Sequence, residues 1–212
     1  MSDNSVTYWD NRFYSGDWEQ KGGRQQTRNF AESQVKYFEI PNDFNGTILD
    51  FGCGLGDAIP VYAAHFPYAK LIGTDFSKEA IKKCKEKFGK IAEFICCDFT
   101  QVPSVDIIIA SNVIEHLQDD VKIADFLKHK CKILFIIVPY KEDLDSDVEH
   151  INRYDERSFG NMGKKRYRVF NCRGWSQYGF DLWYSTYFKN ILRFLAGRKR
   201  IKVRQQIMFI FN

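Results

Sequence analysis

Glycines and acidic residues stand at intervals that suit the binding of a nucleoside. Residues 47–56 read TILDFGCGLG, an apolar run that reaches Asp50 and is followed by Gly52, Gly54 and Gly56. Glycines after a strand let backbone N–H groups approach a polar or anionic ligand closely. Glycines at a strand end also serve plain tight turns, so the residues that follow must decide between the two interpretations.

A second acidic position supports the ligand-binding interpretation. Asp75 and Phe76 end the apolar run LIGTDF, and Asp75 follows Gly56 by 19 residues. A carboxylate at the end of a neighbouring strand can accept hydrogen bonds from both hydroxyls of a ribose. Because Asp50 precedes the glycines and these read G-C-G-L-G, the spacing differs from the G-x-G-x-x-G of dinucleotide binding. A nucleoside is therefore favoured over a pyrophosphate.

The pattern resembles the first motif of the class I S-adenosylmethionine-dependent methyltransferases, which has the form hDhGCGxG. The resemblance extends over residues 45–140 and implies S-adenosylmethionine as the cofactor. It further implies that Asp98 bonds the adenine amino group, that Phe99 packs on the ring, and that Ser111 and Asn112 border the cofactor. An acceptor and an apolar face are the two features that adenine binding needs at this place.

The N-terminal segment is rich in aromatic residues and precedes the first strand. Such a segment can be a cap that packs on the sheet or a lid over the cofactor. In similar small-molecule methyltransferases it supplies polar contacts to the methionine end of the cofactor. Arg24, Gln25 and Gln26 are the candidates here, and we assign this contact to Gln25, whose amide can bond a carboxylate.

His150 is the predicted catalytic residue. The methyl group of such a cofactor is already activated, so a hydroxyl acceptor needs only positioning and the removal of its proton. Imidazole suits this role, and His150 lies beside Glu149 in a polar segment after the fifth predicted strand. The alternative is that His150 is a surface histidine without a partner. If the acceptor is already ionised, no residue needs to remove a proton from it. His116, Glu149 and Tyr154 are next in line, although we expect His116 to brace the helix that follows it.

Comparison with other acceptor classes leaves an oxygen of a small molecule. Methyltransferases that act on DNA bases carry [DNS]PP[YFW] where this chain has SNVI, and protein arginine methyltransferases carry a glutamate pair where only Glu115 appears. The metal-dependent catechol type needs convergent Asp and Asn ligands; we find no such set and predict no metal. Lys164, Lys165, Arg166 and Arg168 would suit a phosphorylated or nucleotide-linked acceptor.

The leading prediction is therefore methyl transfer from S-adenosylmethionine to a hydroxyl or phosphate-type oxygen of a small molecule. Resemblance suggests a surface-glycan precursor and hence polysaccharide biosynthesis as the setting. The alternative is a subunit that binds the cofactor but is inactive, and that scaffolds or regulates another methyltransferase. Only the acceptor side of the site distinguishes the two.

The elements that must position these residues alternate between strands and helices through residue 138. This pattern predicts an α/β fold with a Rossmann-like, seven-stranded, mostly parallel sheet, helices on both faces and an antiparallel last strand. Parallel strands bring their carboxyl ends to one edge, where the predicted site residues would meet. After the apolar run at residues 48–49, which forms the first strand, the predicted strands are 71–76, 93–97, 105–110, 132–138, 166–171 and 205–211. The predicted helices are 29–38, 57–66, 77–88, 119–130 and 184–196, and a turn is expected at 22–27.

Length and composition are those of one domain. The chain has 212 residues, of which 44% are hydrophobic. We divide it into a cap or lid (1–45), a cofactor-binding core (46–140), a substrate insertion (141–165) and C-terminal strands with a helix (166–212). A net charge of +4 gives no argument for nucleic acid, and the basic run 198–204 is interpreted as solvated charge.

The sequence contains few signals for the cellular compartment or the oligomeric state of the protein. The six cysteines form no C-x-x-C pair and are interpreted as buried, reduced thiols. No apolar run approaches the roughly 18 residues of a membrane span. We therefore expect a cytoplasmic protein, and the oligomeric state stays open.

Overall fold

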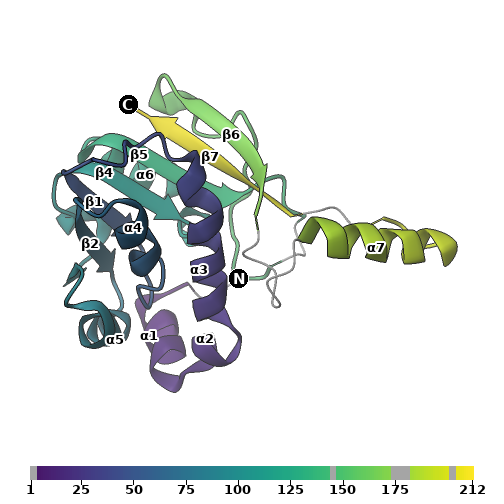
Figure 1. Cartoon of the computed structure of the whole chain (residues 1–212), viewed down its shortest axis with the longest axis horizontal. Helices are drawn as coiled ribbons and strands as arrows, with labels where there is room; N and C mark the ends of the chain where they lie inside the picture. The colour runs from purple at the N-terminus through teal and green to yellow at the C-terminus, as the bar shows by residue number, and fades with distance from the viewer. Residues whose placement is uncertain (1–3, 144–146, 173–181, 201–203) are drawn as a thin grey trace.

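The apolar runs form a seven-stranded sheet in the computed structural model, which describes residues 4–143, 147–172, 182–200 and 204–212 (Figure 1). The spatial order is β3-β2-β1-β4-β5-β7-β6, and β7 runs in the direction opposite to the other six strands. The predicted fold class is therefore confirmed, including the antiparallel last strand. The strands are β1 (Thr47–Phe51), β2 (Lys70–Asp75), β3 (Glu93–Cys96), β4 (Val105–Ser111), β5 (Cys131–Pro139), β6 (Arg166–Asn171) and β7 (Gln205–Phe211).

Helices cover both faces of the sheet. Apolar side chains of α3, α4 and α5 share one core cluster with the strands, and those of α6 share the other. Successive residues of a strand point to opposite faces, so Phe135 belongs to the first cluster and Leu134 and Ile136 to the second. The helices are α1 (Val6–Ser15), α2 (Asp17–Gln20), α3 (Gly23–Gln34), α4 (Ile59–His65), α5 (Lys78–Phe88), α6 (Asp120–Lys128) and α7 (Leu182–Leu195).

The N-terminal segment is helical where a turn had been expected. The chain turns at Gly22, which has a φ of 78°, and α3 begins at the next residue. The predicted turn at 22–27 is therefore wrong, and the candidates for the methionine end lie in the first turns of a helix. Gly16 adopts the same left-handed conformation between α1 and α2.

The predicted start of α5 is confirmed by its cap. The Ser77 hydroxyl accepts a hydrogen bond from the backbone N–H of Ala80 at 3.1 Å, as expected of a helix N-cap. Ser77 also donates through its hydroxyl to Asp10 of α1, at 2.5 Å. The start of α5 is thus joined to the N-terminal helices.

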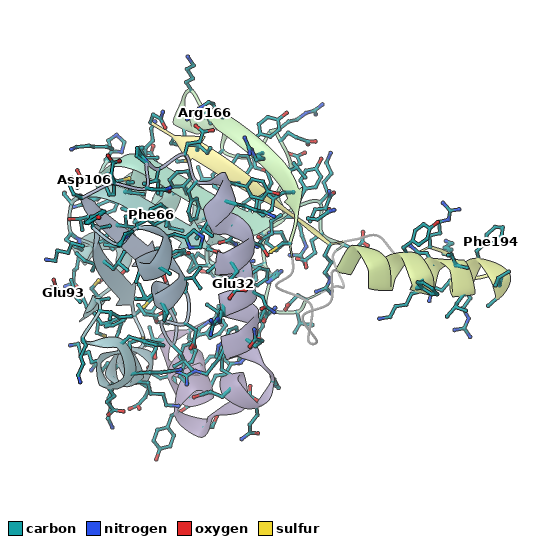
Figure 2. The ribbon with its side chains drawn as sticks, viewed as in Figure 1. Glu32, Phe66, Glu93, Asp106, Arg166 and Phe194 are labelled. Carbon is teal, nitrogen blue, oxygen red and sulfur yellow. The ribbon has the colours of Figure 1, made fainter. Side chains whose placement is uncertain are left out.

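Between β6 and β7, helix α7 extends away from the sheet (Figure 1). Phe194, labelled in Figure 2, lies far from the other labelled residues and is 69% exposed. Among the described residues, no helix has both the length and the apolar character that crossing a membrane requires. The charged residues 198–200 are exposed, as predicted, whereas 201–203 lie outside the described part. All six cysteines are free, but Cys96 is exposed, so the expectation of buried thiols is wrong there.

Candidate functional site

The turn after β1 brings backbone close to an open space. Gly52 and Gly54 have φ of 68° and 51°, which side-chain-bearing residues rarely adopt. The N–H of Gly52 donates to the carbonyl of Thr74 at 2.8 Å and so joins the turn to β2. A Cβ on Gly52 would lie 2.4 Å from Val113, whereas one on Gly54 would meet only the ring of Phe13, at 3.6 Å. Gly54 therefore has room beside it.

That space is a cavity of about 280 Å³ that reaches the carboxyl ends of β1, β2 and β4. Open α/β sheets bind ligands where the strand order reverses, which here is between β1 and β4. The cavity continues to residues 147–150, in the segment after β5. The predicted site residues in its wall are Asp50, Gly52, Gly54, Asp75, Phe76, Asp98, Phe99, Ser111, Asn112 and His150.

Asp75 is held by backbone N–H groups at the end of β2. Its Oδ2 accepts from Gly54 at 2.9 Å, and its Oδ1 accepts from Ser77 at 2.9 Å. Burial raises the pKa of Asp75 to about 6, against the opposing effect of these N–H groups. A carboxylate has about four acceptor positions, so both oxygens can still accept from ligand hydroxyls.

Three buried polar groups meet beside the glycine turn. Burial, and then the neighbouring Asp75, raise the pKa of Asp50 to about 8, so this carboxyl is mostly protonated at neutral pH. The hydroxyls of Tyr62 and Thr74 are buried and have no hydrogen-bond partner among the described residues. Buried polar groups are normally paired. These two hydroxyls therefore suit a polar ligand in the cavity, whose wall both residues form.

Asp98 and Phe99 follow β3 at the edge of the cavity. Oδ1 of Asp98 accepts from the hydroxyl and the backbone N–H of Thr100, at 2.5 and 2.7 Å, and these bonds lower its pKa. Phe99 packs edge-on against Phe126, with ring centroids 5.6 Å apart. An ionised acceptor beside an apolar ring is the pair of features expected for adenine, and the assignment stays a prediction.

The N-terminal helices form a further wall of the cavity, and its residues were not individually predicted from the sequence. Trp9, Arg12, Phe13 and Trp18 line the cavity. The Arg12 guanidinium lies 5.2 Å and 5.0 Å from the ring centroids of Trp9 and Trp18 and forms an ion pair with Glu149. This network connects α1 to the segment after β5 across the cavity.

A salt bridge outside the cavity holds the same helices to α5. Nζ of Lys83 donates to the carbonyl of Phe13 at 2.5 Å and pairs with Glu19 of α2 at 2.8 Å. Neither Lys83 nor Glu19 is part of the cavity wall. The N-terminal helices are thus attached by contacts that a ligand would not touch.

Two histidines, which follow β4 and β5 in the chain, also line the cavity. Nδ1 of His150 lies 2.5 Å from Oε2 of Glu142, and Nδ1 of His116 lies 3.0 Å from the backbone carbonyl of Glu149. The two imidazole rings meet edge to face, with centroids 4.9 Å apart. His116 was expected to brace the following helix, but it forms part of the cavity wall and also contacts Trp9.

The pKa values of His116, His150 and the adjacent Glu115 depend on burial and on nearby charged groups. Burial, and then the neighbouring His150, lower the pKa of His116 to about 4. Burial also acts to lower the pKa of His150, but the hydrogen bond to Glu142 and the charges of Glu115, Glu142 and Asp147 outweigh it, and this pKa is raised. Burial raises the pKa of Glu115 to about 7, against the effect of His150.

Two predicted cofactor residues lie outside the cavity wall. Gly56 faces the core, where a Cβ would come within 3.0 Å of Cys84. Gln25 donates to Asn29 at 2.7 Å along α3, while its neighbour Gln26 faces the cavity. Adjacent helical residues point about 100° apart, so only one of the two glutamines can face the site. Neither Gly56 nor Gln25 gains support from the geometry.

The basic residues 164–168 are also away from the cavity. Arg166 pairs with Glu39, Arg168 lies over the ring of Tyr37, and Lys165 lies over the ring of Phe209. None of the four basic residues named in this stretch is part of the cavity wall. The geometry therefore does not support the idea that they bind a phosphorylated or nucleotide-linked acceptor, which stays a prediction.

Comparison with known proteins adds to this geometry. Residues 48–134 match the family described as "Methyltransferase domain". A trans-aconitate 2-methyltransferase of Azoarcus sp. (strain BH72) is 25% identical over 114 residues, which are 50% of this chain and 45% of that protein. The chain spans less than half the length of the curated relatives it matches.

Solved structures show the same fold. A chain in a complex between the Haloferax volcanii Trm112 methyltransferase activator and a methyltransferase superposes with a TM-score of 0.68 at 15% identity, over 95% of this chain and 96% of that one. The plantazolicin methyltransferase BpumL in complex with SAH gives a TM-score of 0.56 at 16% identity, over 96% and 94% of the two chains. Identities this low speak for the architecture alone.

Proposed function

We propose that this chain transfers a methyl group from S-adenosylmethionine to an oxygen atom of a small molecule, because residues 48–134 match a methyltransferase domain and the strands form the predicted sheet. One observation carries the proposal. A single cavity is lined by the glycine turn and Asp75 and also by His150. Cofactor and acceptor sites in one enclosed space are what direct group transfer requires.

Residues beside the glycine turn would hold the cofactor. Asp75 would accept the ribose hydroxyls, Asp98 and Phe99 would receive the adenine, and Gly54 would let the backbone come close. The unpaired hydroxyls of Tyr62 and Thr74 would bond polar groups of the same ligand. When bound, S-adenosylmethionine supplies a methyl group that its sulfonium sulfur already activates.

His150 is our candidate for the residue that acts on the acceptor. Glu142 engages its Nδ1, so Nε2 is the atom left for an acceptor oxygen. A hydroxyl acceptor, such as that of a glycan precursor, would need this help to lose its proton. A carboxylate acceptor would not need it, and the named substrate of the Azoarcus relative, trans-aconitate, is a carboxylate. The hydroxyl is our leading proposal because an imidazole lines the cavity.

The proposal is tested by supplying the full chain with methyl-labelled S-adenosylmethionine and a panel of acceptors. The panel contains sugars, nucleotide sugars, phosphorylated metabolites and tricarboxylates. We expect label in one hydroxyl-bearing class. Label in tricarboxylates alone would contradict the hydroxyl assignment. Cofactor binding without transfer to any class would favour the inactive scaffold that the sequence also allows.

For the active acceptor, His150→Ala should lower turnover by about 10² to 10⁴, the usual range for loss of a group that assists proton transfer. Cofactor affinity should change little, since the imidazole of His150 pairs with Glu142 and Asp147 and not with a residue proposed to hold the cofactor. His129→Ala is the matched control, because His129 is exposed and bonds only within α6 and its end. Wild-type turnover in the His150 variant would place acceptor activation on another residue.

A further inference from the structure

We infer that Glu115, His116 and His150 form a binding site for a divalent transition-metal ion beside the cavity, whose wall includes both histidines. One ligand atom from each of the three side chains lies within 4.8 Å of the others. Glu115 and His116 follow β4 directly, and His150 comes from the segment after β5. This set could not be expected from the sequence, because His150 is 34 residues from His116 and 35 from Glu115.

Glu115 provides the first argument, because its carboxylate is fully buried and incompletely paired. Oε1 accepts from the side-chain amide of Asn112 at 3.2 Å. Oε2 is buried and has no hydrogen-bond partner among the described residues. A buried carboxylate oxygen without a partner is costly. A cation between Glu115 and the two histidines would remove this cost.

The second argument is the orientation of the two imidazoles. Nδ1 of His116 faces the backbone carbonyl of Glu149, which can only accept, so Nδ1 carries the proton and Nε2 has a free lone pair. Nδ1 of His150 faces the carboxylate of Glu142, which favours the same tautomer. Histidines that bind metals commonly donate their other ring N–H to a carboxylate or a backbone carbonyl. Both histidines have this arrangement, with two different partners.

The donor set indicates the kind of ion. Two imidazoles and one carboxylate suit Zn²⁺ in catalytic sites, where a further position stays open, and also suit Fe²⁺ and related ions. Mg²⁺ and Ca²⁺ prefer oxygen ligands and are disfavoured. Bonds of about 2.1 Å at the tetrahedral angle place two ligand atoms about 3.4 Å apart, so the three side chains must close by up to about 1.4 Å to hold the ion. Asp147, with Oδ2 3.7 Å from Nε2 of His150, adds negative charge nearby.

Such an ion would change how His150 acts. With Nε2 bound to the ion, His150 would hold the metal instead of accepting a proton. The ion, acting as a Lewis acid, would then lower the pKa of an acceptor hydroxyl in the cavity. This role in transfer rests on the proposed function, whereas ion binding itself does not.

The site is tested on the untagged, full chain after treatment with a chelator. Calorimetric titration with Zn²⁺ and with Mn²⁺, and metal analysis after dialysis, should give one Zn²⁺ per chain with Mn²⁺ bound more weakly. Glu115→Gln and His150→Ala should each lower the Zn²⁺ affinity by more than about 100-fold. Glu142→Gln, which keeps the size of the side chain but weakens its bond to His150, should lower it by about 10- to 100-fold.

His129→Ala is the control, because His129 is exposed and outside the set. Thermal unfolding of each variant shows whether it is folded, and Glu142→Gln tests the site even if Glu115→Gln fails to fold. Absence of Zn²⁺ binding by the wild-type chain, or equal loss in the His129 and His150 variants, would overturn the inference. Methyl transfer that is undiminished in the metal-free chain would remove the ion from the reaction and leave the proposed function intact. Zn²⁺ binding without methyl transfer would support the site and count against the proposed function.

Discussion

At the scale of single residues, the site contains carboxyls whose burial changes their charge. Asp50 and Asp75 lie near the carboxyl ends of two adjacent strands, β1 and β2, and the charge of Asp75 disfavours ionisation of Asp50 in addition to the effect of burial. Backbone N–H groups keep the pKa of Asp75 lower than that of Asp50. Asp75 is therefore the carboxyl available as a charged acceptor at neutral pH, and Asp50 is mostly neutral.

Replacement of Asp50 by Asn should change how stability depends on pH. Folding raises the pKa of Asp50 from about 4 to about 8, so the folded state binds more protons between these values. The free energy of unfolding should then fall as pH rises through this range, and Asp50→Asn should remove that part of the fall. Between pH 5 and pH 8 the wild-type chain should lose at least about 1.4 kcal/mol more than the variant, the equivalent of one pKa unit.

Urea unfolding at the two pH values, without ligand, measures this difference. The other titratable groups that face Asp50 are Asp75, Tyr62 and Cys53, and they are present in both proteins. Their contributions therefore cancel to first order in the comparison. Parallel pH dependence in the two proteins would mean that Asp50 is ionised in the folded state.

At the scale of elements, regular hydrophobic patterns were predictable and the N-terminal helices were not. The bounds of β6 and β7 agree with those expected from the sequence, because turn residues and charges delimit both runs. In α1 to α3 the aromatic residues face the cavity as well as the core, so they do not follow the period of a helix on a sheet. The partners of Arg12 and Lys83 lie far away in sequence, and no local pattern indicates them.

Weakening the attachment of α1 and α2 to α5 should speed ligand dissociation. Lys83→Met removes the bonds to the backbone carbonyl of Phe13 and to Glu19 and substitutes no residue of the cavity wall. Partly exposed ion pairs contribute about 0.2 to 1 kcal/mol, so S-adenosylhomocysteine should dissociate about two- to fivefold faster. Stopped-flow displacement measures the rate. Lys82→Met is the control, because Lys82 is the exposed neighbour on the same helix. Equal rates in both variants would show that the N-terminal helices do not retain the ligand.

At the scale of the whole molecule, the order of the strands explains why distant residues meet. Parallel strands bring the turn after β1, Asp75 after β2 and Ser111 after β4 to one edge of the sheet. This meeting could be predicted from the sequence because strands and helices alternate. The set of Glu115, His116 and His150 could not, because it depends on the path of the segment after β5, which has no periodic pattern.

Helix α7 should contribute little to the stability of the sheet. Phe188, Leu192 and Leu195 are 68%, 63% and 76% exposed. Changing all three to Ser should leave the free energy of unfolding within about 1 kcal/mol of wild type, since exposed positions usually contribute little each. Leu134→Ala, at a fully buried position of β5, should lower it by about 2 to 5 kcal/mol. A loss of similar size in the α7 variant, measured in the same urea titration, would mean that this helix packs on the protein in solution.

The central claim is that the cavity binds S-adenosylmethionine through Asp75, and calorimetric titration with S-adenosylhomocysteine tests it most directly. The wild-type chain should bind one ligand. Asp75→Asn should weaken binding by about 10- to 150-fold, the equivalent of 1.5 to 3 kcal/mol for hydrogen bonds to a charged group. Glu93→Gln, at the amino end of β3, outside the cavity wall and labelled in Figure 2, should bind as wild type does. No binding by the folded wild-type chain, or equal affinity in folded Asp75→Asn, would contradict the account.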